Sequence, residues 1–125
     1  MAVQDDHMIR NIQDVGRLIA KLLLHEQQPN YTLPENEADY TEADKLFVTI
    51  MKLAEEGKIN EAENELYVGM VEDDVDYLEL ALTFYLYLND MDGDFLDNNG
   101  YSREEVVDGM KELASDWGVT GLEAF

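Results

Sequence analysis

The sequence predicts an all-α fold, with one helical domain over residues 1–125. Three observations predict it. Apolar residues recur at spacings of three and four along most of the chain. Residues that cap helices stand before several of these stretches, and no segment alternates apolar and polar residues as a half-buried strand does. We expect about five helices: a long N-terminal amphipathic helix packed with antiparallel helical hairpins.

The first helix is expected over about residues 5–25. Its apolar positions recur at spacings of four, three, four and three and form one stripe: Met8, Ile12, Val15, Ile19 and Leu22. Pro29 and Pro34 end this pattern, because proline interrupts helical hydrogen bonding. Residues 27–40 therefore form a connection, which is long for one between two helices and is either packed or partly mobile.

The next two helices form a hairpin over residues 41–71. Thr41 is the predicted N-cap of the first helix, and Gly57 ends it where a left-handed residue is favoured. The following helix is expected to begin at Asn60, with Glu63 three residues later completing a capping box. An amphipathic pattern on both sides of Gly57 predicts that the two helices pack against each other.

A second hairpin is expected over residues 76–117. Its first helix, about residues 76–89, is apolar on nearly all sides, which is typical of a helix buried between others. Its second helix begins after Ser102, and Glu105 makes a capping box with it. Between them lies an acidic turn, residues 89–101.

The segment "ADKLFVTIMKLAEEGKINEAENELYVGM", residues 43–70, resembles a tetratricopeptide-type hairpin. The residues that match the repeat pattern are Leu46, Leu53, Gly57, Ala62 and Leu66. Ile50 stands where the repeat favours glycine, and Asp74 where it favours proline. The resemblance implies right-handed packing of tetratricopeptide-like hairpins, and a generic helical bundle is the alternative.

The N-terminal stretch "DDHMIRNIQDVGRLIAKLLL" is similar to the opening of a family of small uncharacterised bacterial proteins, known only as a domain of unknown function. In that family an apolar helix precedes tetratricopeptide-like hairpins, and the matching positions here are Arg10, Ala20 and Lys21. The resemblance implies a helical fold and supplies no activity.

The charge is strongly negative and unevenly distributed. The formal net charge is −21, and residues 59–102 contain twelve acidic residues and no basic one. Such a surface repels phosphate groups, so we expect no direct binding to nucleic acids or to anionic membranes. It attracts a basic or amphipathic protein partner. Solubility through net charge is the alternative explanation.

The location expected from composition is the cytoplasm. The chain has no cysteine, which fits a reducing compartment. Residues 1–7 are polar and acidic where a signal peptide needs a basic segment. The apolar run at residues 77–88 is about 18 Å long as a helix, at ~1.5 Å per residue, too short to cross a bilayer.

The acidic turn raises the question of a calcium site. Asp90, Asp92, Asp94 and Asp97 are candidate ligands, with Glu105 as a further carboxylate. An EF-hand needs oxygen ligands at loop positions 1, 3 and 5, glycine at position 6 and glutamate at position 12, and neither register of this segment supplies all of them. Calcium binding through residues 90–105 is therefore the alternative function, and no other cofactor is expected.

No residue pattern indicates catalysis, and we expect no enzyme activity. The two histidines, His7 and His25, are 18 residues apart. On one helix this separation is about 27 Å, at ~1.5 Å per residue, too far for a shared metal. Carboxylates are so numerous that their presence predicts no acid–base chemistry.

The leading functional hypothesis is therefore a protein–protein interaction module. The candidate partner-binding residues are the aromatic residues of the fourth helix, which are alternatively core: Tyr77, Phe84, Tyr85 and Tyr87. The apolar stripe of the first helix could also pair with a second copy and make a homodimer. Acidic mimicry of a nucleic acid is a lower alternative.

Overall fold

The computed structural model describes residues 2–122, and within them it contains α-helices and no strand. The six α-helices are α1 (Ala2–Ile19), α2 (Glu42–Glu55), α3 (Ile59–Gly69), α4 (Val75–Asn89), α5 (Gly93–Asn98) and α6 (Arg103–Asp116). The π-helical turn η1 (Ala20–Leu24) continues α1, and the 3₁₀ turn η2 (Glu37–Asp39) precedes α2. The all-α prediction is confirmed.

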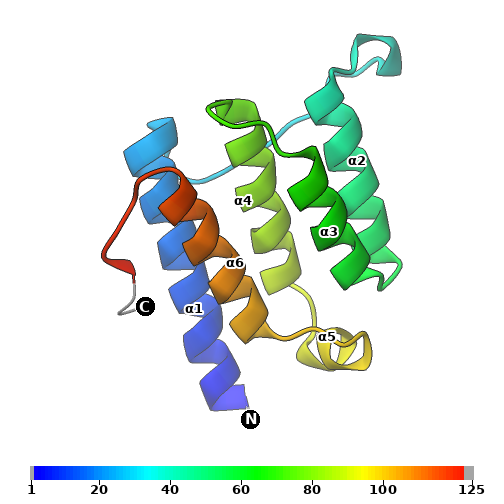
Figure 1. The fold of residues 1–125 in the computed structure, drawn as a ribbon. Coiled ribbons are helices and arrows are strands. Elements are labelled where there is room, and N and C mark those ends of the chain that lie inside the picture. The colour runs from blue at the N-terminus through cyan, green and yellow to red at the C-terminus, as the bar shows by residue number, and fades with distance from the viewer. Residues whose placement is uncertain (1, 123–125) are drawn as a thin grey trace.

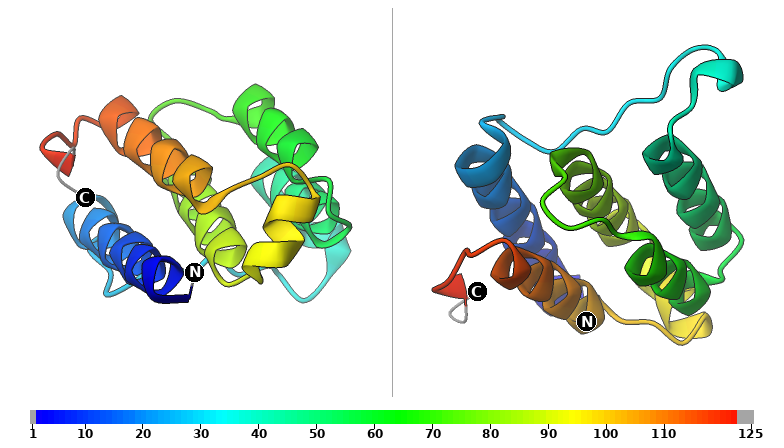
Figure 2. Two further views of the ribbon diagram at one scale, coloured as in Figure 1. Left: turned by 90° about the horizontal axis from the view of Figure 1, so that it is seen from below. Right: turned by 45° about the horizontal axis from the view of Figure 1, so that its top comes forward.

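The five long helices lie in two layers, with α1, α4 and α2 in one layer and α6 and α3 in the other (Figures 1 and 2). The short connection between α2 and α3 makes them an antiparallel pair with extensive packing. Helix α4 packs against α1, α2 and α6. Its sequence explains this central position, because apolar residues surround it, and the fully buried ones include Leu78, Leu80, Leu82, Phe84 and Leu88.

The N-terminal helix has its predicted orientation. Ile12, Val15 and Ile19 are buried, whereas Leu22 is 53% exposed. The register changes at η1, where the wider π turn rotates the end of the helix. His25 ends it in a left-handed conformation, with φ of 57°.

The connection after η1 is packed against the helices. The backbone N–H of Asn30 donates to Glu79 Oε2 (3.1 Å), and that of Tyr31 donates to Thr83 Oγ1 (3.1 Å). The Tyr31 hydroxyl donates to Asp44 Oδ1 (2.6 Å). This bond and the backbone N–H of Thr41 hold the pKa of Asp44 below its usual range. The connection is therefore tied to α4 and to the start of α2.

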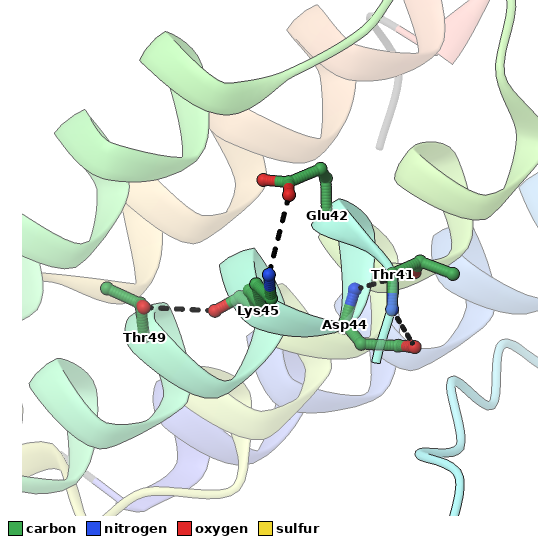
Figure 3. A network of polar contacts seen from close by, with 5 residues as sticks. All are labelled: Thr41, Glu42, Asp44, Lys45 and Thr49. Carbon is green, nitrogen blue, oxygen red and sulfur yellow. Dashed lines mark hydrogen bonds and ion pairs between the residues drawn. The ribbon is translucent and has the colours of Figure 1, made fainter. Parts of the chain in front are cut away.

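Thr41 is the N-cap of α2, as predicted, and it forms a capping box with Asp44 (Figure 3). Thr41 Oγ1 accepts a hydrogen bond from the Asp44 N–H (3.2 Å), and Asp44 Oδ2 accepts one from the Thr41 N–H (2.9 Å). Lys45 forms an ion pair with Glu42 (3.5 Å) on the exposed side of the helix. Gly57 follows the helix with φ of +86°, which confirms its predicted role.

The predicted start of α3 is wrong. The helix begins at Ile59, and its N-cap Lys58 makes no side-chain capping bond. Asn60 instead donates from Nδ2 to the Gly100 carbonyl oxygen (3.1 Å), and Glu63 accepts hydrogen bonds from two tyrosines on other segments. Asn60 and Glu63 do not form the predicted capping box, because each side chain is hydrogen-bonded to residues that are distant in sequence.

The acidic turn 89–101 contains a helix, α5, that accounts for the difference between five expected helices and six observed ones. Asp92 begins it as N-cap, with Oδ1 accepting from the Asp94 N–H (2.8 Å). The buried guanidinium of Arg103 donates from Nη2 to the carbonyl oxygens of Asn89 (3.1 Å) and Met91. These hydrogen bonds hold the first residues of the acidic turn against the start of α6.

We predict that Gly57→Ala destabilises the protein more than Gly118→Ala. Both glycines have a left-handed φ, of +86° and +82°, which costs another residue about 1–2 kcal/mol. A Cβ at Gly57 would also lie 2.6 Å from Asn99 Oδ1, whereas nothing lies within 4 Å of one at Gly118. Urea unfolding should therefore give a loss for Gly57→Ala about 1 kcal/mol larger than for Gly118→Ala. Equal losses would contradict the close packing of Gly57 on Asn99.

A second prediction concerns pH. Burial and the neighbouring Glu26 carboxyl raise the pKa of Glu79 to about 7. Because the folded pKa lies above the unfolded value, Glu79 stabilises the fold at pH 4 and this contribution is lost as the pH rises through 7. Glu79→Gln, whose amide oxygen can still accept from Asn30, should flatten the fall in Tm between pH 5 and pH 8.

The matched control for this charge change is Glu61→Gln, at an exposed position on α3. It removes one negative charge and should leave the pH dependence of Tm as steep as in the wild type. If both variants change the slope equally, general charge repulsion rather than Glu79 is responsible.

Candidate functional site

A groove lies between α3 and α6, and α4 forms its floor. It has a volume of about 460 Å³. Its lining residues come from three helices and the loop after α3: Leu66, Tyr67, Met70, Val71, Glu72, Asp73, Ala81, Tyr85, Gly109, Leu113, Asp116 and Trp117. The groove exists because α3 packs mainly on α2, whereas α6 packs on α1 and α4.

Exposed apolar side chains gather at the end of this groove that lies beside the loop after α3, which we call the open end. Among the described residues seven large apolar side chains are exposed, and four of them lie within residues 67–75. Tyr67 and Val71 line the groove and are 49% and 45% exposed. An apolar surface that clusters beside a concave site is typical of an interaction surface, whereas scattered single residues are not.

The floor of the groove depends on a glycine in α6. A Cβ at Gly109 would lie 2.5 Å from the Cζ and hydroxyl atoms of Tyr85. Glycine costs about 1 kcal/mol relative to alanine inside a helix. Because Gly109 has no side chain, the Tyr85 ring lies directly against the α6 backbone, and its hydroxyl reaches the space between α3 and α6.

A hydrogen-bonded network of tyrosines surrounds Glu63, about one turn of α3 before the groove residue Tyr67. Glu63 Oε2 accepts from the hydroxyls of Tyr85 (2.7 Å) and Tyr101 (3.1 Å). The hydroxyls of Tyr67 and Tyr85 lie 3.5 Å apart. Burial raises the pKa of Glu63 above its ordinary value, and the two tyrosine hydrogen bonds partly offset that rise. Burial also raises the pKa of both donors, Tyr85 and Tyr101.

The walls of the groove are negatively charged. Glu72, Asp73 and Asp116 line it, and none of its lining residues, all within the described part of the chain, is basic. Burial raises the pKa of the Tyr67 hydroxyl, and the carboxylates of Glu63, Glu112 and Asp116 raise it further. Because these three residues come from α3 and α6, both walls contribute negative potential at Tyr67.

The aromatic residues proposed from sequence as partner-binding lie mainly in the core. Tyr77, Phe84 and Tyr85 are buried, and Tyr87 is partly buried and packed against the core. Only Tyr85 lines the groove. Tyr67 and Trp117 were not candidates from the sequence, although both line the groove.

The candidate calcium ligands share a second, shallower hollow. Asp90, Asp92, Asp94 and Asp97 line it together with Arg103, and its volume is about 570 Å³. Asp92 is the N-cap of α5, as described above. Within residues 2–122 no three His, Asp or Glu side chains are arranged so that they could hold a metal ion. Calcium binding through this segment stays a prediction.

The fold and the groove define an acidic, all-helical protein with a concave surface between two parallel helices. The profile of a family of unknown function, DUF6483, matches residues 2–118, and the chain belongs to this family. The family resemblance seen at the N-terminal helix is thereby confirmed. Comparison with curated proteins and with solved structures gave no match. Among residues 2–122, no helix combines the length and apolar composition needed to cross a membrane.

We predict that removing a tyrosine hydroxyl raises the pKa of Glu63. Tyr85→Phe should raise it more than Tyr101→Phe, because the Tyr85 bond is shorter and has the larger pKa-lowering effect. Carboxyl ¹³C chemical shifts followed through a pH titration measure this pKa directly. An unchanged pKa in both variants would contradict the network.

Proposed function

We propose that this protein is a non-catalytic interaction module that binds a basic partner protein in the groove between α3 and α6. The observation that supports this most is the combination of an exposed apolar surface with carboxylates on both walls. Burial of this apolar surface against a partner is favourable because it removes apolar area from water. The negative walls favour a partner of positive charge.

The apolar surface mainly determines the affinity for a partner, and the carboxylates mainly affect the rate of association. Exposed ion pairs contribute only about 0.2–1 kcal/mol each, so the carboxylates alone give weak affinity. Their summed field attracts a cationic partner from a distance and raises the rate of association. The apolar surface around Tyr67 and Val71 then supplies most of the binding free energy, at roughly 25 cal/mol per Å² removed from water.

We expect the module to act in the cytoplasm, with no cofactor. Self-association, calcium binding and mimicry of a nucleic acid stay predictions, and no observation at the groove favours one of them. The tetratricopeptide-like character of the hairpins and a bacterial origin likewise remain expectations that come from sequence resemblance.

Titration calorimetry with two synthetic helical peptides tests the proposal. One carries leucine on one face and lysine on the other, and its counterpart replaces every lysine with glutamate. We expect the lysine peptide to bind and the glutamate peptide not to bind. Affinity for the lysine peptide should fall as salt increases, because screening weakens attraction between exposed charges.

A pair of double variants locates the site. Glu112→Gln with Asp116→Asn neutralises the α6 wall, and Glu104→Gln with Asp108→Asn makes the same charge change at other exposed positions of α6. The wall variant should weaken lysine-peptide binding about threefold to tenfold relative to the control variant, since each pair is worth about 0.2–1 kcal/mol. Equal weakening would mean that net charge rather than the groove governs binding.

A further inference from the structure

We infer that the groove binds a single amphipathic α-helix that runs antiparallel to α3 and α6, with its basic residues toward its own N-terminus. This inference rests on the proposed function and goes further, because it specifies the secondary structure and the direction of the partner. Three properties of the groove support it: its helical walls, the direction of those walls and the position of its negative charge.

The walls have the geometry that receives a helix. On α3 and its C-cap Met70 the lining positions are 66, 67 and 70, and on α6 they are 109, 113 and 116. These spacings of three and four produce the ridges and grooves in which side chains of another helix interdigitate. Binding by strand addition, in which an extended peptide pairs with a sheet edge, has no template here because the described residues contain no strand.

The length of the groove sets the size of the contact. The lining positions of α6 and its C-cap Trp117, from 109 to 117, span about 12 Å at ~1.5 Å per residue. This distance is a little over two helical turns. A docked helix therefore places about three apolar residues in the groove, at positions i, i+3 or i+4, and i+7.

The direction follows from α3 and α6 themselves. Both helices run the same way, from the side of α5 toward the opposite end of the bundle (Figure 1). The groove is lined by their C-terminal halves, so the partial negative charges of both C-termini lie at its open end, where, among the described helices, only α4 contributes an N-terminus. Glu72, Asp73 and Asp116 add negative charge at the same end.

A docked helix places its own partial positive charge, which is at its N-terminus, at this open end. Lysine or arginine in its first turns then faces the three carboxylates, while the apolar side chains contact the surface that includes Met70, Leu113 and Trp117. The opposite direction would bring two partial negative charges and three carboxylates to the negative end of the partner helix.

Two stapled peptides of equal composition test the direction. Each is a helix of about 18 residues, roughly 27 Å long at ~1.5 Å per residue, with the same leucine face. One has its lysines in the N-terminal half and the other in the C-terminal half. The side-chain staples keep both helical, so that their own helicity does not differ. We expect the first peptide to bind about two- to fivefold more tightly.

A nitroxide label on the N-terminus of the first peptide gives an independent readout. It should broaden the backbone amide signals of Val71 and Gly118, near the open end, more than those of Asn60 and Glu105 at the other end. Equal affinity of the two peptides, or stronger broadening at Asn60 and Glu105, would overturn the inferred direction.

Two matched variants test whether the helix occupies the groove. Val71→Ser removes an apolar side chain that lines the groove, and Val68→Ser removes one on the same segment that does not, although Val68 is 83% exposed. We expect Val71→Ser to weaken binding about fivefold and Val68→Ser to change it less than twofold. Equal effects would overturn docking in the groove.

The outcomes separate the two levels of the proposal. If neither lysine peptide binds, the proposed function itself fails. If both bind equally well and Val71→Ser weakens them, the interaction module stands and the inferred direction fails.

Discussion

The burial of α4 is the constraint on which the rest of the structure depends. A helix that is apolar on nearly all sides must be covered on all sides, and α1, α2, α6 and the connection at residues 30–31 cover it. Each large apolar side chain that it buries contributes about 1.5–3 kcal/mol, so the helix as a whole accounts for stabilisation comparable to the net stability of a domain. The groove lies along α4 between α3 and α6, where Ala81 and Tyr85 of α4 form its floor.

Much of the fold could be predicted from sequence because its signals are local. The caps Thr41 and Ser102 and the glycine stop at Gly57 depend on neighbouring residues alone, and the structure has all three. Asn60 has the same local signal and a different role, because it bonds to Gly100, forty positions away. Capping patterns predict correctly where no distant group competes for the side chain. The short helix α5 was not predicted, because six residues are too few to show a helical periodicity of apolar positions.

The candidate site could be predicted only in part. The negative charge follows from composition, but the groove depends on how far α3 lies from α6, and no pattern within one helix predicts that distance. The aromatic residues of α4 were candidates because they are numerous, and most are buried because the helix is central. Tyr67 belongs to the groove because it faces the gap between the two hairpins, which is a property of their packing.

The contact between Gly109 and Tyr85 constrains how this protein can change over time. The Tyr85 ring on α4 occupies the volume that a side chain at position 109 of α6 would need, so position 109 cannot take a larger residue while Tyr85 is present. Any residue larger than glycine at position 109 requires a smaller one at position 85, and with it the loss of the hydroxyl that reaches Glu63. Among descendants of this sequence a change at position 109 should therefore come with a change at position 85, and such paired changes would mark chains whose groove has a different floor.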